Sequence, residues 1–202
     1  MASDAAALQG AVWGDSVIAY RLVWCELALA WAVWWYVPAF RAPHRQKRPS
    51  ITARGPTLLG LVFEVSAYGL AVWMRQPAAG IAWPRLLVAA LAAPLGVATM
   101  WTAVAHLGRQ FRINAGLYAD HELVSTGPYA VIRHPIYASM LLMLIATAAL
   151  LTRPAWALAA MALFVTGTEI RVRAEDRLLA SRFGDRFAAY RREVAAYIPF
   201  VR

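Results

Sequence analysis

The chain has 202 residues, of which 61% are hydrophobic and only 15% are charged, a composition too apolar for an ordinary soluble domain of this length. Its formal net charge of +9 is typical of some nucleic-acid binders, but here the basic residues lie between long apolar runs. We therefore expect no nucleic-acid partner and an integral membrane protein whose basic residues set its orientation. The single cysteine, Cys25, leaves no disulfide framework to consider.

Five apolar runs predict transmembrane helices, because about 20 helical residues cross a hydrocarbon core of about 30 Å. In chain order they cover residues 16–40, 56–74, 83–107, 136–151 and 154–170. The last two are short, and only Thr152 and Arg153 separate them, which predicts a tight helical hairpin. The expected fold class is thus an all-α polytopic helix bundle that forms one domain, residues 1–202.

One acidic residue lies inside the second apolar run. A carboxylate is costly in lipid, so we expect Glu64 to contact a substrate or to pair with a polar residue of a neighbouring helix, such as Arg21 in the first run.

Basic residues are distributed unequally between the connecting segments. Sixteen of the 20 lysines and arginines fall within 41–54, 109–133 and 171–202, which share one side of the membrane if the spans alternate. Because Lys and Arg in short loops remain in the cytoplasm, we expect the amino terminus outside and the carboxyl terminus in the cytoplasm.

Two polar segments on that side, 108–137 and 169–200, are richer than simple connectors need to be, and they predict a shared pocket. In the first, Pro135 is suited to a first helical turn, whose free N–H groups can hold an anionic group. Arg133, His134 and Tyr137 surround that turn and can contact a ligand. In the alternative interpretation, Arg133 and His134 mark the end of a span and contact lipid headgroups.

In the second segment, Arg171 and Glu175 are four residues apart and share one helical face. The alternative is an ordinary surface ion pair, worth at most about 0.5 kcal/mol. An apolar stripe further along predicts a helix that lies on the membrane surface. Its members are Leu178, Leu179, Phe183, Phe187 and Tyr190. We expect no metal site, because His106 and His121 have no Cys or His companions at a recognisable spacing.

The stretch "HELVSTGPYAVIRHPIYAS", followed by "RVRAEDRLLASRFGDRFAAYRREVAAYIP", resembles the isoprenylcysteine carboxyl methyltransferase family of membrane enzymes. The resemblance covers roughly Gly108 to Phe200 and implies a cofactor-binding catalytic region in 108–202 after three amino-terminal spans in 1–107. It also implies S-adenosylmethionine as cofactor, with Arg171 near a substrate carboxylate and Glu175 in contact with the cofactor. Two departures from the family pattern are Asp176, where a second glutamate is usual, and Ser139, where glycine is common and where serine can tighten helix packing.

The complete set of expected site residues combines this resemblance with the residue-level reasoning above. Arg171 and Glu175 are the expected catalytic residues. The expected cofactor-binding residues are Asn114, His121, Glu122, Leu123, Val124, Gly127, Tyr129, Arg133, His134, Pro135, Ile136, Tyr137, Glu175 and Asp176.

The resemblance further implies a lipophilic acceptor that reaches the site from the bilayer, with a prokaryotic inner membrane as the location. A carboxylate acceptor, of an isoprenylcysteine-like or another membrane-partitioned molecule, needs no general base. A thiol or amine would need one, for which Glu175, His134 and His121 are the candidates. Two other classes remain open: an NADPH-dependent membrane reductase of the sterol reductase type, and a non-catalytic membrane scaffold.

Overall fold

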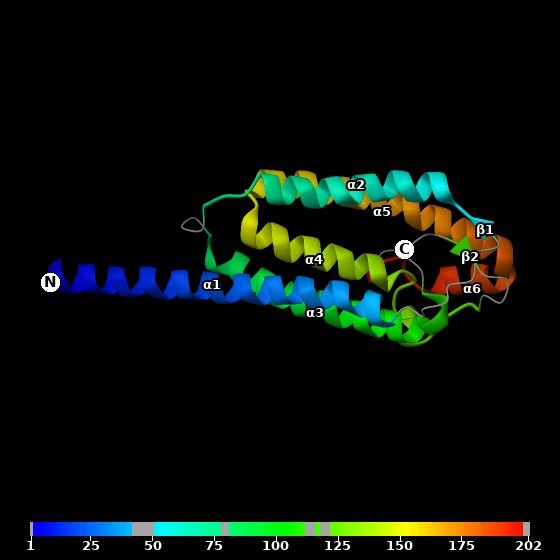
Figure 1. The fold of residues 1–202 in the computed structure, drawn as a ribbon, viewed down its shortest axis with the longest axis horizontal. Coiled ribbons are helices and arrows are strands. Elements are labelled where there is room, and N and C mark those ends of the chain that lie inside the picture. Colours follow the sequence, from blue (N-terminus) through cyan, green and yellow to red (C-terminus); the bar gives the residue numbers. More distant parts are fainter. Residues whose placement is uncertain (1, 42–50, 78–80, 112–115, 118–121, 200–202) are drawn as a thin grey trace.

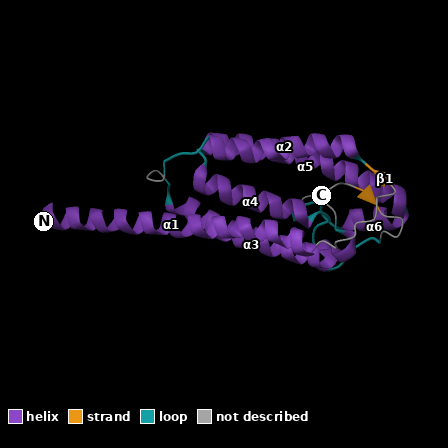
Figure 2. Cartoon of the chain, viewed as in Figure 1, coloured by secondary structure: helices purple, strands orange, loops and turns teal. Residues whose placement is uncertain are grey.

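A computed structural model describes residues 2–41, 51–77, 81–111, 116–117 and 122–199. Within these ranges the fold consists almost entirely of helix (Figure 2). The six α-helices are α1 (Ala2–Arg41), α2 (Arg54–Trp73), α3 (Trp83–Leu107), α4 (Pro135–Leu151), α5 (Pro154–Phe183) and α6 (Asp185–Glu193). The two strands, β1 (Ile51–Thr52) and β2 (Gly116–Leu117), form a small antiparallel pair.

Four of the helices are long and apolar enough to cross a membrane: α2, α3, α5 and the Val17–Val37 part of α1. The all-helical, polytopic membrane fold expected from the sequence is therefore confirmed. The fifth expected span, α4, is a shorter apolar helix of 17 residues. It lies among the other helices (Figure 1), and its Met143, Leu144 and Leu150 side chains are fully buried in the core.

Two glycines bring α2 and α5 into close contact. A Cβ atom added to Gly60 would lie 2.6 Å from the carbonyl oxygen of Gly167, and one added to Gly167 would lie 2.6 Å from that of Gly60. Only a residue without a side chain fits such a close approach of two backbones, which is the usual role of small residues between membrane helices. The crossing determines which polar side chains of the two helices can meet.

The expected hairpin between α4 and α5 is present, and polar contacts from other helices hold it. The Thr152 hydroxyl donates to the Ala71 carbonyl of α2 at 2.8 Å. Arg85 of α3 donates to the carbonyls of Ala148, at 3.1 Å, and Thr152. These bonds fasten the turn between α4 and α5 to α2 and α3.

At the opposite end of the bundle, on the right in Figure 1, the polar segments gather; we call it the loop end. Here β1 pairs with β2, and Ile132 forms a bridge with Ala195 of the tail. Gly184, with φ of +51°, ends α5 and begins α6. The polar tail is therefore two helices with a turn between them, because glycine adopts this conformation readily.

Candidate active site

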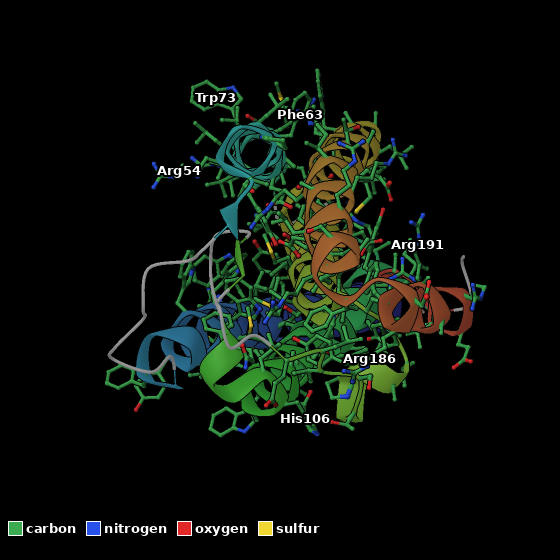
Figure 3. All side chains as sticks on the ribbon, turned by 90° about the vertical axis from the view of Figure 1, so that its right-hand side faces the viewer. Arg54, Phe63, Trp73, His106, Arg186 and Arg191 are labelled. Atoms are coloured by element: carbon green, nitrogen blue, oxygen red, sulfur yellow. The ribbon has the colours of Figure 1, made fainter. Side chains whose placement is uncertain are left out.

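A cavity of about 280 Å³ lies at the loop end. Its walls come from α1, α2, α3, α4, α5 and α6 and from the segment that joins α3 to α4. Figure 3 looks onto this end and labels Arg54 at the start of α2 and Arg186 and Arg191 on α6. The expected pocket between the two polar segments is thus present, and the amino-terminal helices also contribute to it.

His134 connects the start of α4 to two carboxylates of α5. Its Nε2 atom lies 2.9 Å from Oδ1 of Asp176, and its Nδ1 atom lies 3.3 Å from Oε2 of Glu175. Burial would lower the pKa of His134, but the two carboxylates outweigh it and raise the pKa to about 9. Both ring nitrogens therefore donate, and His134 is a cation at neutral pH. This charge disfavours the role of general base that the sequence left open for it.

Arg133 fastens the carboxyl-terminal tail to the same cluster. Its guanidinium donates to Oδ2 of Asp176 at 3.2 Å and to the carbonyl of Val194. The backbone N–H groups of Arg133 and His134 donate to the carbonyls of Ala195 and Ala196, each at 2.8 Å. The side chains of Arg133 and His134 are only 8% and 5% exposed, so the alternative of headgroup contacts is wrong.

The expected catalytic pair belongs to one connected network. The Tyr137 hydroxyl donates to Oε1 of Glu175 at 2.5 Å. The guanidinium carbon of Arg171 lies 4.9 Å from the centre of the Tyr137 ring, which gives a cation–π contact. Arg171 is 6% exposed and forms an ion pair with Glu64 of α2, with 2.5 Å between Nη1 and Oε2. Arg171 is therefore a buried residue and not part of an ordinary surface ion pair.

Glu64 is the functional candidate whose partner the sequence did not identify. It is 1% exposed, and its Oε1 atom accepts a bond from the Thr168 hydroxyl at 3.2 Å. The expected pairing with Arg21 is wrong, because the carboxylate faces α5. A buried carboxylate inside an apolar run was the available signal, but only the helix packing identifies its partner.

Two buried polar atoms of uncharged side chains on the cavity wall have no hydrogen-bond partner among the residues that the structure describes. They are the hydroxyl of Tyr129 and Oε1 of Gln110. Burial, and secondly the Glu175 carboxylate, raises the pKa of Tyr129, so its hydroxyl stays protonated and can donate. Because a buried polar atom without a partner is costly, both atoms are suited to binding a polar ligand.

The rest of the wall is apolar and reaches the outer surface of the bundle. Trp34 is held in place by a bond from its Nε1 atom to the Ser139 hydroxyl at 3.3 Å, so Ser139 joins α4 to α1. Beside it, Trp35 is 64% exposed and Leu61 of α2 is 36% exposed. Since these are membrane helices, the cavity connects a polar interior with a lipid-facing surface.

The structure places most of the expected site residues on this cavity. Those on its wall are Glu122, Leu123, Val124, Tyr129, Arg133, His134, Ile136, Tyr137, Arg171 and Glu175. Asn114 and His121 lie outside the described residues. Three others do not line the wall: Pro135 begins α4, Asp176 binds His134 and Arg133, and Gly127 lies against the His106 ring.

The apolar stripe of the tail has a different role from the one we expected. Leu178, Leu179 and Tyr190 line the cavity, and Phe187 is buried. The interpretation of one helix lying on the membrane surface is therefore wrong. The Tyr190 hydroxyl donates to the carbonyl of Tyr129 at 2.5 Å and so joins α6 to the opposite wall.

The fold and the cavity are those of a helical membrane protein with a candidate ligand site at one end of its bundle. The sequence model of the isoprenylcysteine carboxyl methyltransferase family matches residues 88–181, which include α4 and most of the cavity residues. Residues 88–181, a little under half of the chain, therefore carry the sequence pattern of this family, as the motifs indicated.

Curated relatives agree with that assignment over about half of the chain. Protein-S-isoprenylcysteine O-methyltransferase B of Arabidopsis thaliana is 30% identical over 53% of this chain and 55% of its own length. Protein-S-isoprenylcysteine O-methyltransferase of Tribolium castaneum is 32% identical over 53% of this chain and 39% of its own. The cobalt-zinc-cadmium resistance protein CzcN of Cupriavidus metallidurans is 35% identical over 51% of this chain and 43% of its own length. The aligned part therefore spans about half the length of these relatives.

Proposed function

We propose that the protein transfers a methyl group from S-adenosylmethionine to the carboxylate of a lipophilic acceptor. The observation that carries the proposal is the cavity itself, which joins a buried charged network and two unpartnered polar atoms to an apolar wall that reaches the lipid-facing surface. The match of residues 88–181 to the family model supports the same reaction class.

The residues on the wall fit this cofactor. The Tyr129 hydroxyl can donate to a carboxylate or ribose oxygen, and Oε1 of Gln110 can accept from an amine or hydroxyl. Leu123 and Leu178 provide apolar surface for an aromatic base. When bound, S-adenosylmethionine supplies an electrophilic methyl group on a sulfonium sulfur. Loss of that methyl group converts the sulfonium into a neutral thioether. Glu175 provides negative charge near that cation.

Charge balance favours this cofactor over NADPH. The cations of the network, Arg133, His134 and Arg171, each contact a carboxylate: Asp176, Glu175 or Glu64. A cofactor with several phosphates would need cations that are not already neutralised in this way. A sulfonium cofactor with a net positive charge, together with an anionic acceptor, keeps the buried site near neutrality.

The network also favours a carboxylate acceptor over a thiol or an amine. His134 is protonated, and Glu175 already accepts bonds from Tyr137 and His134. Neither group is therefore suited to removing a proton from an acceptor, and a carboxylate needs no such step. Arg171 can hold that carboxylate, since a planar guanidinium matches its geometry better than lysine does.

The proposal extends to the identity of the acceptor and to the orientation of the protein in the membrane. Two of the relatives are named as isoprenylcysteine methyltransferases, so an isoprenylcysteine is the first acceptor to test. We place the loop end and the carboxyl terminus in the cytoplasm, with residues 108–202 as the catalytic region. The cofactor then enters from water, while the acceptor enters along the wall formed by Trp34, Trp35 and Leu61.

The test uses purified protein in detergent and lipid. Calorimetric titration with S-adenosylhomocysteine should give heat of binding, whereas titration with NADPH should give none. Release of S-adenosylhomocysteine is then measured with S-farnesylcysteine, a long-chain fatty acid, an alkyl thiol and an alkyl amine. Turnover with the acids supports the proposal. Binding of NADPH alone would favour a reductase, and cofactor binding without any turnover would favour a scaffold.

A further inference from the structure

We infer that Glu64 is a positioning residue of the active site, which fixes the guanidinium of Arg171 and whose charge limits how tightly Arg171 holds the acceptor carboxylate. This inference rests on the proposed function, because it gives Arg171 the role of binding the acceptor. Glu64 lies in α2, outside the segment that matches the family model, residues 88–181.

The contact has the geometry of a fixed support. Oε2 of Glu64 lies 2.5 Å from Nη1 of Arg171, and the carboxylate and the guanidinium are 1% and 8% exposed as side chains. The Thr168 hydroxyl holds the other carboxylate oxygen at 3.2 Å. With both of its oxygens bound to α5, the carboxylate has one orientation, and it transmits that orientation to Arg171.

The helix crossing explains why Glu64 reaches Arg171. Gly60 lies one helical turn before Glu64, and a Cβ atom there would lie 2.4 Å from Cγ of Arg171. The stem of Arg171 therefore passes over the bare backbone of α2, which brings its head group to the Glu64 carboxylate. The ring of Tyr137 faces the same guanidinium from α4 at 4.9 Å.

A guanidinium shared by two carboxylates binds each of them less strongly than it would bind one alone. An acceptor carboxylate in the cavity must therefore share Arg171 with Glu64, and its oxygen keeps more of the electron density that methyl transfer needs. Glu175 and His134, the nearby charged groups of α5 and the α4 cap, neutralise each other through their 3.3 Å contact. Glu64 contacts Arg171 directly, so its charge weakens the hold of the guanidinium on the acceptor.

The experiment compares Glu64→Gln with the wild-type protein and with Glu169→Gln. Glutamine retains the size of Glu64 and an acceptor for Nη1, but it removes the charge. Glu169 is a matched control on α5, because its carboxylate binds Tyr197 at 3.0 Å and Arg173 at 3.1 Å and does not line the cavity. Four quantities are measured: the dissociation constant of S-adenosylhomocysteine, that of S-farnesylcysteine with cofactor-free protein, and kcat and KM for S-farnesylcysteine.

For Glu64→Gln we expect kcat to fall at least tenfold while the cofactor dissociation constant stays within twofold of the wild-type value. S-farnesylcysteine should bind to the cofactor-free variant at least as tightly as to the wild type, and its KM should not rise. A purely structural role for Glu64 would instead weaken binding of both ligands together. Glu169→Gln should resemble the wild type in all four quantities.

The inference is overturned if Glu64→Gln retains wild-type kcat, or if it loses acceptor and cofactor affinity in parallel. If Glu64→Gln does not fold, Glu64→Asp replaces it, which keeps the charge but withdraws the carboxylate from Nη1. Loss of kcat with unchanged cofactor affinity in that variant supports the inference, and wild-type kinetics or failure to fold overturns it. A wild-type protein that neither binds S-adenosylhomocysteine nor methylates any acid refutes the proposed function itself.

Discussion

The charge on His134 makes the stability of the protein depend on pH in a defined direction. Burial lowers the pKa of His134, but Asp176 and Glu175 raise it from 6.5 to about 9. A histidine whose pKa is higher in the folded state stabilises the fold fully below the unfolded value, near 6.5. That stabilisation is lost as the pH rises through 9.

The size of the effect follows from the two pKa values. Each pKa unit is worth about 1.36 kcal/mol, so the difference corresponds to about 3 kcal/mol of stabilisation at low pH. Tyr190 and Tyr197, whose pKa values burial raises to about 12, stay protonated over the range from pH 7 to 10. Because unfolded tyrosines ionise only near pH 10, they add little to the pH dependence below about pH 9, where most of the His134 effect falls.

The assay follows thermal unfolding in detergent by tryptophan fluorescence and circular dichroism between pH 6 and 10, for the wild type and for His134→Gln. The wild-type Tm should fall by several degrees between pH 7 and 10. His134→Gln should be less stable than the wild type at pH 7 and should show a flatter pH profile, because the titrating group is absent. Equal profiles for the two proteins would show that His134 is not the buried cation that we describe.

Three further substitutions test separate parts of the site. Tyr129→Phe should weaken S-adenosylhomocysteine binding about fivefold, which corresponds to the loss of one neutral hydrogen bond, and should not lower Tm, because the hydroxyl has no partner among the described residues. An unchanged dissociation constant would contradict the role of the hydroxyl. Gly60→Ala should cost about 1–3 kcal/mol of stability, because its Cβ would clash with the Gly167 carbonyl and with the Arg171 side chain. Gly69→Ala, whose Cβ would meet nothing within 4 Å, should cost far less, and equal costs would contradict the close crossing. Arg171→Lys should lower kcat/KM for S-farnesylcysteine roughly 10- to 100-fold while cofactor affinity is retained, since lysine lacks the planar fork; loss of cofactor affinity instead would move Arg171 to the cofactor site.

Local patterns predicted the helices and one half of the site. The apolar runs and the Pro135 turn define helix positions because their signals lie within about 20 consecutive residues. The turn also placed His134 and Tyr137 on the cavity wall, where the structure has them. Arg171 and Glu175 both line the same cavity, as their spacing on one helical face allowed.

The remaining features depend on contacts between distant residues. Glu64 and Arg171 are 107 positions apart and meet only because α2 and α5 cross at two glycines. The charge on His134 likewise follows from Asp176 and Glu175, each more than 40 residues away, and no local pattern encodes that meeting. The sequence pattern did not single out Gly184, and the apolar stripe of the tail fits either a membrane surface or a cavity wall. Only the position of α6 decides between them.

The central claim is that the segment from 122 to 137 and the helices α5 and α6 form one cofactor pocket. The most direct measurement is ultraviolet cross-linking of radiolabelled S-adenosylmethionine to the protein in lipid, with the attachment sites mapped by mass spectrometry. We predict labels on cavity residues of both segments, such as Tyr129 and Tyr190, and their loss when S-adenosylhomocysteine competes. Labels confined to helix surfaces away from the cavity, or labels that S-adenosylhomocysteine does not displace, would contradict the account.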